Sequence, residues 1–281
     1  RRRQRQMCIR DSRQMNCHFG TRMLNAQGDW KTLTDIKNSA SDISCVSGQM
    51  PRIVGLGYAS KLFRNNKGLS DLHNFSINGN EVIFGTIGDA STSEGHFWES
   101  INACGVLQIP VVMSIWDDGY GISVPSEYHT TRNDLSKVLS GFQRSSKKEN
   151  GFEIFTVKAW DYEGLLNAYS SAVNFARKEH VPSIIHVKDV TQPQGHTTSG
   201  SHERYKSKER LQWEKDFCCI KRMRSWIIKN NIADNKELDK IEKKALEKAK
   251  LARDISWKAY RKPIEEDLSN AVAIITRVAQ H

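Results

Sequence analysis

Short apolar runs alternate with helical patterns through the middle of the chain. EVIFGTIGD (81–89) and IPVVMSIW (109–116) have the length and composition of buried strands, and SEGHFWESINACGVLQ (93–108) between them repeats its apolar residues at helical spacing. A strand–helix–strand unit of this size is right-handed and places its two strands in parallel. The alternation therefore predicts an α/β fold built on a parallel sheet.

The same alternation returns further along the chain. FEIFTVKAWD (152–161) and PSIIHVKDV (182–190) are predicted strands, and EGLLNAYSSAVNFARKE (163–179) is the predicted helix between them. Upstream, MPRIVGLGYASKLFRNN (50–66) is a predicted helix with Pro51 in its first turn. We therefore expect a doubly wound, mostly parallel sheet with a helical extension at its C-terminus.

The chain changes character after about residue 206. From Ser207 to Tyr260 the pattern is helical and charged, and the last twenty residues favour a short helix or a linker. One apolar stripe is predicted in this part: Trp213, Phe217, Ile220, Met223 and Ile227. We expect an α/β domain over residues 13–205 and a charged helical extension over residues 206–281.

Residues 1–12, RRRQRQMCIRDS, do not fit either part. This tract resembles a translated sequencing-adapter sequence of the kind found at the ends of gene fragments, so we exclude it from the fold prediction as one would a fusion scar. We expect the natural protein to continue upstream of Arg13.

The net charge of +10 would suit a nucleic-acid-binding protein, but its distribution argues against that function. Residues 1–12 carry +4 and residues 201–260 carry +7, whereas residues 13–200 sum to −1. No apolar run approaches the roughly 18 residues that a membrane span needs, and no secretory signal follows the Arg-rich start. The six cysteines are scattered without a CxxC pair, which is typical of reduced thiols in a cytoplasmic protein.

Acidic residues directly follow two of the predicted strands. Asp89 ends the first strand and Asp117 and Asp118 follow the second, and parallel strands open on one edge of the sheet, where ligands bind. Mg²⁺ prefers carboxylate and phosphate oxygens, and a helix starting near Ser93 can direct its N-terminal amides at a phosphate. The spacing is consistent with a metal–diphosphate clamp. Residue spacing alone also allows these acids to be helix caps and turn formers.

The order of the motifs carries a family resemblance. GD (88–89), then DGYGIS (118–123), then GHTTS (195–199) resembles the thiamine diphosphate-binding half of the E1 component of 2-oxo acid dehydrogenase complexes, whose pattern is GDG or GEG followed by NNxY. The likeness covers nearly all of residues 13–230, is closest to the branched-chain E1 α subunit, and includes SCVSGQMPRIVGLGYASK (44–61). The tract WDDGYGISVP is similar to bacterial enzymes that carry the α and β parts on one polypeptide.

The resemblance implies thiamine diphosphate and Mg²⁺ as cofactors. Asp89 matches the family's first Mg²⁺ ligand, Asp118 stands where the family usually has an Asn ligand, and Tyr120 matches the residue whose main-chain carbonyl completes the protein's share. A carboxylate in place of the Asn adds negative charge beside the diphosphate, so we expect cofactor binding to depend more strictly on the metal.

Further cofactor contacts are carried over position by position. The resemblance implies cofactor contacts at Ser44, Val46, Gly88, Ala90 and His196. Trp116 replaces an Arg that contacts diphosphate in the branched-chain enzyme. Gln49 matches a residue of a neighbouring K⁺ site, but Cys45 and Gly48 replace that site's usual Pro and Thr, which argues against K⁺ here.

His196 matches the family's active-site histidine. A histidine pKa lies near neutrality, which suits a group that holds the reaction intermediate and positions the lipoyl group. A solvated loop histidine is the alternative. Residues 197–199 occupy the phosphorylation loop of the mammalian proteins, although hydroxyl groups alone do not imply a kinase, and Arg13 and His18 fall in a substrate-side loop of the family.

The resemblance implies the α portion of an E1 that decarboxylates a branched-chain 2-oxo acid and transfers the acyl group to lipoylated E2. The implied partners are an E1 β part, fused or separate, and the E2 core, with a heterotetramer or a fused homodimer as the full protein. The β part supplies the activating glutamate, so we expect this chain alone to be inactive. The alternatives are a pyruvate-type E1 α and a non-catalytic basic binding module. We expect neither a nucleic-acid nor a membrane partner.

Overall fold

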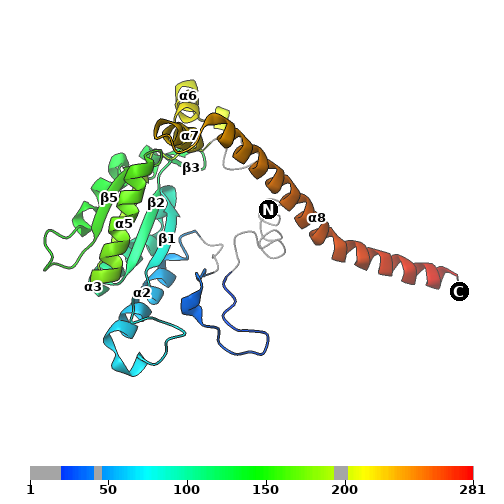
Figure 1. The fold of residues 1–281 in the computed structure, drawn as a ribbon, viewed down its shortest axis with the longest axis horizontal. Helices are drawn as coiled ribbons and strands as arrows, with labels where there is room; N and C mark the ends of the chain where they lie inside the picture. The colour runs from blue at the N-terminus through cyan, green and yellow to red at the C-terminus, as the bar shows by residue number, and fades with distance from the viewer. Residues whose placement is uncertain (1–19, 41–45, 193–201, 281) are drawn as a thin grey trace. The chain divides into compact units, whose positions relative to one another are not determined.

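The computed structural model describes residues 20–40, 46–192 and 202–280 and contains the predicted parallel sheet (Figure 1). The strands β1 (Ile83–Gly88), β2 (Val111–Trp116), β5 (Glu153–Lys158) and β6 (Ser183–Lys188) pair in parallel in the order β1-β2-β6-β5. Each lies inside one of the four strands predicted from the sequence. A short antiparallel hairpin, β3 (Tyr120–Gly121) with β4 (Val124–Pro125), stands apart from this sheet.

Helices cover both faces of the sheet, which confirms the doubly wound α/β class. The helices α2 (Met50–Asn65) and α3 (Gly95–Leu107) pack on one face, and α5 (Tyr162–Glu179) packs on the other. Alternate residues of β2 enter opposite clusters: Val111 and Met113 pack with α2 and α3, whereas Val112 packs with α5. The central strands β2 and β6 are covered on both faces and are buried almost continuously, whereas burial alternates along the second half of the edge strand β1.

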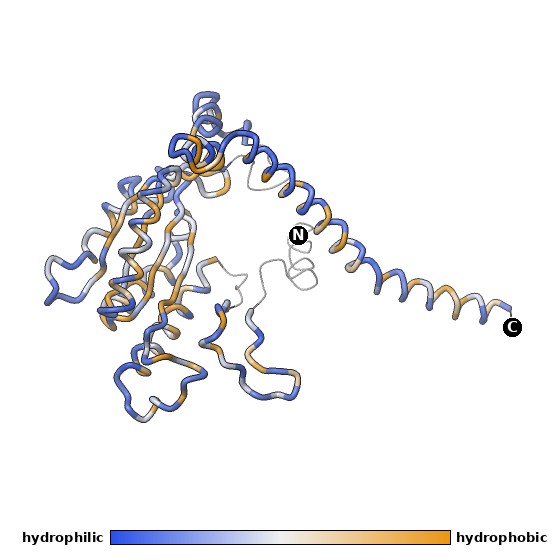
Figure 2. The backbone as a smooth tube through the Cα atoms, in the orientation of Figure 1, coloured by the Kyte–Doolittle hydropathy of each residue, from blue (hydrophilic) through white to orange (hydrophobic). Residues whose placement is uncertain are grey.

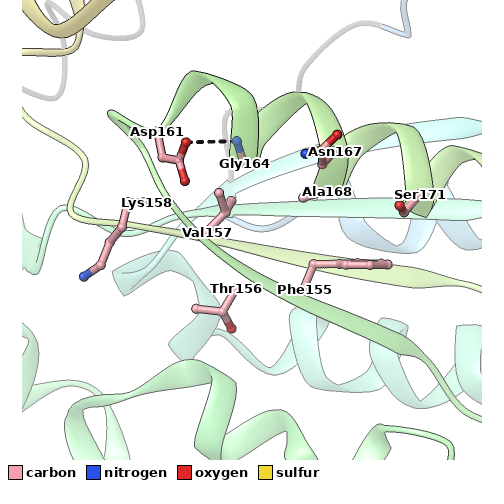
Figure 3. Close-up of a pocket in the computed structure, with 9 residues that line it drawn as sticks. All are labelled: Phe155, Thr156, Val157, Lys158, Asp161, Gly164, Asn167, Ala168 and Ser171. Atoms are coloured by element: carbon pink, nitrogen blue, oxygen red, sulfur yellow. Dashed lines mark hydrogen bonds between the residues drawn. The ribbon is translucent and has the colours of Figure 1, made fainter.

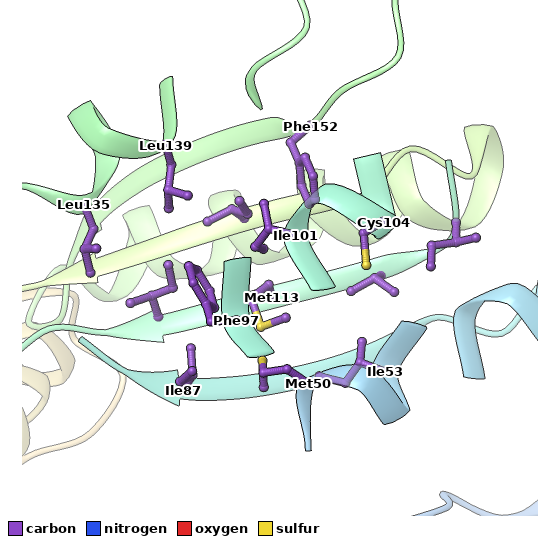
Figure 4. Packing of buried hydrophobic residues seen from close by; sticks show 14 residues of the cluster. Met50, Ile53, Ile87, Phe97, Ile101, Cys104, Met113, Leu135, Leu139 and Phe152 are labelled. Carbon is purple, nitrogen blue, oxygen red and sulfur yellow. The ribbon is translucent and has the colours of Figure 1, made fainter. Parts of the chain in front are cut away.

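The larger core cluster lies between the sheet, α2, α3 and the short helix α4 (Leu135–Leu139) (Figure 4). The apolar side of α3 is buried as predicted, with Phe97 and Ile101 at 0% exposure and Cys104 at 1%. Burying each large apolar side chain contributes about 1.5–3 kcal/mol, so this face anchors the helix that follows Asp89.

Local sequence signals fix the ends of α5. Asp161 Oδ1 accepts a hydrogen bond from the Gly164 N–H at 2.9 Å, and His180 ends the helix in a left-handed conformation with φ of 54°. Three small residues at four-residue spacing form its buried face: Ala168, Ala172 and Ala176. This row lets α5 pack close to the sheet.

The charged extension differs from its prediction in two places. A break after Asp216 separates α6 (Lys208–Asp216) from α7 (Cys219–Lys229), and Ile220, predicted to share an apolar stripe with Trp213, is 73% exposed. The break resets the helical phase, so spacing counted across it no longer identifies one face. In addition, α8 (Asn235–Ala279) continues through Pro263 to the end of the described chain, where we predicted a short helix or a linker.

The chain divides into two compact units, Arg1–Arg222 and Met223–His281. Within the second unit, Arg224 pairs with Asp239 at 2.6 Å and with Glu242 at 2.8 Å, which ties α7 to the start of α8. Figure 2 shows apolar residues recurring among hydrophilic ones along α8. Of the helices in the described part of the chain, none combines the length and apolar composition that crossing a membrane requires.

Candidate functional site

The carboxyl ends of neighbouring strands bring the predicted acids together. Gly88 and Trp116 are register partners at the ends of β1 and β2, and the Asp89 N–H donates to the Trp116 carbonyl at 3.1 Å. On the other side of β2, the Asp117 N–H donates to the Val187 carbonyl of β6 at 2.9 Å. The segments that follow three adjacent strands therefore meet at one edge of the sheet.

A cavity of about 750 Å³ opens at this edge, a volume typical of small-molecule and cofactor sites. Residues from the loops after β1, β2 and β6 form most of its wall. Its lining residues are Val46, Gln49, Thr86, Ile87, Gly88, Asp89, Ala90, Ser91, Trp116, Asp118, Tyr120, Gly121, Ile122, Val190, Thr191 and Gln192.

Asp89 is a buried acid in the cavity wall, with 4% of its surface exposed. Its Oδ2 has no hydrogen-bond partner among the described residues, and the Nε2 of His129 lies 3.9 Å away. Burial, followed by the negative charges of Asp117 and Asp118, raises the pKa of Asp89 to about 8. A bound cation would stabilise the charged form of a carboxylate in this position.

Asp118 begins a tight turn that contacts the loop after β1. Its Oδ1 accepts a hydrogen bond from the Tyr120 N–H at 3.1 Å, and Gly119 between them has φ of 80°, a conformation that favours glycine. A Cβ on Gly121 would lie 2.7 Å from the Cβ of Ala90, so the two loops are in direct contact. Burial raises the pKa of Asp118 as well.

A basic segment of the charged extension supports this turn. Arg210 Nη2 on α6 donates to the Asp118 carbonyl at 2.7 Å, and Lys206 Nζ lies 4.9 Å from the centre of the Tyr120 ring. Buried Glu214 accepts from both cations, from Lys206 Nζ at 2.7 Å and from Arg210 Nε at 2.9 Å. The first helix of the extension therefore contributes to the site and is more than a solvated charged face.

Asp117 makes different contacts from its neighbour. Its Oδ1 accepts from the Gly119 N–H at 2.9 Å, and its Oδ2 lies 2.8 Å from the Nε2 of His186. Burial acts to raise the pKa of Asp117, but the contact with His186, the Gly119 N–H and the charge of Lys188 together outweigh it, and the pKa is lowered. Both carboxylate oxygens of Asp117 are thus engaged inside the protein, whereas Asp118 lines the cavity.

The donor set fits a hard cation that arrives together with an anionic cofactor. Among the residues that the structure describes, no group of three or more His, Cys, Asp or Glu side chains is placed to hold a metal by itself. Asp89 and Asp118 line one cavity, and Mg²⁺ usually takes one or two carboxylates with phosphate and water oxygens completing its shell. The remaining ligands would therefore come from the cofactor, from water and from backbone carbonyls.

The helix that we expected to start near Ser93 is α3, which begins at Gly95. The 3₁₀ turn η3 (Ala90–Ser93), which was not predicted, lies between it and Asp89. The Thr92 hydroxyl donates to the Asp89 carbonyl at 2.6 Å and stabilises this turn. The cavity is lined by the start of η3 and not by α3, so the amides that follow Asp89 directly lie nearer the cavity than those of α3.

The structure gathers most of the predicted site residues. Those that line the cavity together are Val46, Gly88, Asp89, Ala90, Asp118 and Tyr120, along with Gln49 and Trp116. Ser44 and His196 lie outside the described residues, as do Arg13, His18 and residues 197–199. Their roles as ligands or catalytic groups stay predictions.

The sequence did not point to His129, His186 or Arg210. Each reaches the site from a different element, and none belongs to a motif. The one available signal was His186, a polar residue between the apolar residues Ile185 and Val187 of the predicted strand 182–190.

A second hollow, of about 400 Å³, lies between β5 and α5 (Figure 3). Its lining includes Lys158 and Asp161, and Asp161 is occupied in capping α5. The predicted site residues do not line this hollow, so the cavity at the strand ends is the candidate site.

Comparisons with known proteins show which family the chain belongs to. The family described as dehydrogenase E1 component matches residues 6–265. The chain is 26% identical over 230 residues to the pyruvate dehydrogenase E1 component subunit alpha of Rickettsia bellii, covering 82% of this chain and 63% of that protein. It is 25% identical over 256 residues to the 2-oxoisovalerate dehydrogenase subunit alpha 1 of Arabidopsis thaliana, covering 90% and 46%.

The chain thus spans less than two thirds of the length of these curated relatives. Among solved structures, a transketolase from Campylobacter jejuni is similar with a TM-score of 0.38 and 18% identity, covering 54% of this chain and 20% of that one. The family match extends over most of the sequence and includes the loops that form the cavity wall. The chain therefore belongs to the dehydrogenase E1 component family.

Proposed function

We propose that the chain is the α portion of a thiamine diphosphate-dependent 2-oxo acid dehydrogenase E1, with the cofactor's diphosphate and Mg²⁺ in the cavity at the strand ends. One observation carries the proposal. Asp89 and Asp118, from the ends of two parallel strands, line the same cavity in a chain of this family.

When bound, thiamine diphosphate supplies the carbanion chemistry that releases CO₂ from a 2-oxo acid. The residues of this chain bind and orient it. Asp89, Asp118 and the Tyr120 carbonyl are the proposed metal ligands, and the backbone from Gly88 to Ala90 is the proposed diphosphate contact. Arg210 holds the turn that carries two of these ligands. His196 remains the proposed active-site histidine.

The proposed partners are an E1 β part, fused or separate, and a lipoylated E2. The relatives that the chain matches are named as α subunits or as subunits of an E1 component. A β part would complete the cofactor site, and E2 would receive the acyl group.

For the substrate we propose a branched-chain 2-oxo acid, on the resemblance of residues 13–230 to the branched-chain E1 α subunit. Pyruvate is the second candidate, favoured by the pyruvate dehydrogenase relatives. The full protein, assayed with its β part and lipoylated E2, should show a higher kcat/KM for 3-methyl-2-oxobutanoate than for pyruvate. A higher kcat/KM for pyruvate would reverse the assignment.

Cofactor binding is tested by thermal unfolding of the chain in complex with its β part. Thiamine diphosphate and Mg²⁺ together should raise the Tm, because a ligand that binds only the folded state stabilises it. Mg²⁺ with ADP is the control for unspecific diphosphate binding, and Asp89→Ala should abolish the rise. An equal rise with ADP, or none with thiamine diphosphate, contradicts the proposal. Duplex DNA binding that weakens steeply with salt would support the basic binding module instead.

A further inference from the structure

We propose that His186 is a positioning residue for the cofactor-binding turn, acting together with Ser136 through Asp117. The proposal rests on the proposed function, because the role it assigns is directed at the cavity that would hold the cofactor. His186 lies on β6, is 0% exposed and does not line that cavity. Any effect it has on a ligand must therefore pass through another residue.

The imidazole of His186 connects two side chains from different elements. Its Nε2 lies 2.8 Å from Asp117 Oδ2, and its Nδ1 lies 2.6 Å from Ser136 Oγ. An ionised carboxylate only accepts hydrogen bonds, so Nε2–H is the donor to Asp117, and a neutral ring then accepts at Nδ1 from the Ser136 hydroxyl. With both ring nitrogens engaged, the tilt of the imidazole is fixed.

We call the hydrogen-bonded series Ser136–His186–Asp117 the relay. The fold holds its far end, Ser136, in place. Ser136 lies in the first turn of α4, where its N–H donates to Asp134 Oδ1 at 3.1 Å, and Asp134 Oδ2 accepts from Lys188 Nζ of β6 at 3.1 Å. The Ser136 hydroxyl also lies 2.8 Å from the Oγ1 of Thr156 on β5. Ser136 cannot move without breaking bonds that tie α4 to two strands of the sheet.

The near end of the relay is the turn that follows β2. Asp117 accepts from His186 at one carboxylate oxygen and from the Gly119 N–H, at 2.9 Å, at the other. It therefore bridges the rigid sheet to the turn that presents Asp118 and Tyr120 to the cavity. Without His186, Asp117 loses the hydrogen bond that fixes its side-chain torsions. The hydrogen bond from the Gly119 N–H to Asp117 Oδ1 then weakens, because its acceptor is no longer held in position.

Serine, histidine and aspartate in one row also occur in hydrolases, but the geometry here argues against a nucleophilic serine. Ser136 lines neither of the two cavities described above, and its hydroxyl is engaged by both His186 and Thr156. A substrate has no access to a ring that is 0% exposed. The arrangement holds groups in place and does not attack a substrate.

Amide hydrogen exchange of the ligand-free chain, followed by NMR, tests the relay without any cofactor. His186→Leu removes both hydrogen bonds at similar size, and exchange of the Gly119 amide should accelerate about tenfold or more, the size expected for one lost hydrogen bond to a charged group. His186→Gln keeps a donor toward Asp117 and should restore most of the protection. Ser136→Ala should accelerate Gly119 exchange by a smaller factor than His186→Leu. If His186→Leu does not fold, the comparison of Ser136→Ala with His186→Gln serves as the test, and equal Gly119 exchange in both variants and wild type overturns the relay.

His180 provides the matched control. It is a second buried histidine, bonded through Nε2 to the Gly79 carbonyl at 2.9 Å, and its left-handed backbone tolerates asparagine. His180→Asn should leave Gly119 exchange at the wild-type rate. Equal acceleration in His180→Asn and His186→Leu, or none in His186→Leu, overturns the relay.

Calorimetric titration of the chain in complex with its β part, with thiamine diphosphate at saturating Mg²⁺, links the relay to the cavity. The Kd should rise about tenfold in His186→Leu and recover in His186→Gln, a rescue that a general loss of packing would not give. An unchanged Kd in His186→Leu overturns the positioning role. If the wild-type complex binds neither Mg²⁺ nor thiamine diphosphate, the proposed function and with it the positioning role fail. Gly119 exchange still decides whether His186 holds the turn.

Discussion

Replacement of Asp89 gives the sharpest test of the site. Burial and the charges of Asp117 and Asp118 raise its pKa from 3.8 to about 8. Between these values an unfolded chain has released the proton while the folded chain still holds it. The stabilisation from protonated Asp89 is therefore complete below pH 3.8 and is lost as the pH rises toward 8.

The size of the effect follows from the same values. One pKa unit corresponds to about 1.4 kcal/mol, so the whole gap sets an upper bound of roughly 6 kcal/mol. Water entry and small loop shifts reduce the penalty of a buried charge, and we expect about 3 kcal/mol. Asp89→Asn keeps the shape and removes the charge, so the variant should gain stability relative to wild type as the pH rises.

Urea unfolding of the ligand-free chain between pH 5 and pH 8.5, without Mg²⁺, measures this difference. The free energy of unfolding of Asp89→Asn minus that of wild type should grow across the range. Asp71→Asn, at an exposed carboxylate, is the control and should show a flat difference. A flat difference for Asp89→Asn as well would refute the reasoning. With the β part, Mg²⁺ and thiamine diphosphate present, wild type should become the more stable of the two, because only wild type keeps the carboxylate that would bind the metal.

Three further substitutions test separate features. Asp118→Asn removes one negative charge, so calorimetric titrations should show thiamine diphosphate binding that depends less on Mg²⁺ than in wild type; an unchanged dependence contradicts the role of Asp118. Gly121→Ala must displace the Ala90 contact at 2.7 Å and should cost about 1–3 kcal/mol in urea unfolding, whereas Gly55→Ala, with open space around it, should cost nothing. Phe97→Ala empties a fully buried position and should cost about 3–5 kcal/mol by the same measurement, and a loss below about 1 kcal/mol would mean that the core closes around the gap.

The acids of the site were predictable because the patterns that place them are local. An apolar run predicts a strand, and parallel strands fix where their carboxyl ends lie, so Asp89 and Asp118 could be brought together before any coordinates were known. The likeness to the family then suggested what they hold. The same local logic placed the buried face of α3.

The supports of the site were not predictable, because they depend on contacts between distant segments. Arg210 is 92 residues from Asp118, and His186 is 69 residues from Asp117. No spacing rule connects such pairs, since their contact depends on how the sheet is ordered and where α6 packs. The exposed Ile220 shows the same limit on a smaller scale, because one break between helices invalidated a pattern counted across it.

The order of the strands has a consequence for synthesis of the protein. Of the four strands of the described parallel sheet, β6 is translated last, yet it lies between β2 and β5. Until residues 183–188 leave the ribosome, β2 pairs with β1 alone and its other edge is open. Residues 111–115 of β2, which are almost completely buried in the folded protein, then lack the strand that pairs with them on that side. Open apolar edges pair with other chains, so the nascent domain passes through a stage that needs protection from aggregation. A chain that stops before β6 should form aggregates and not a smaller soluble domain.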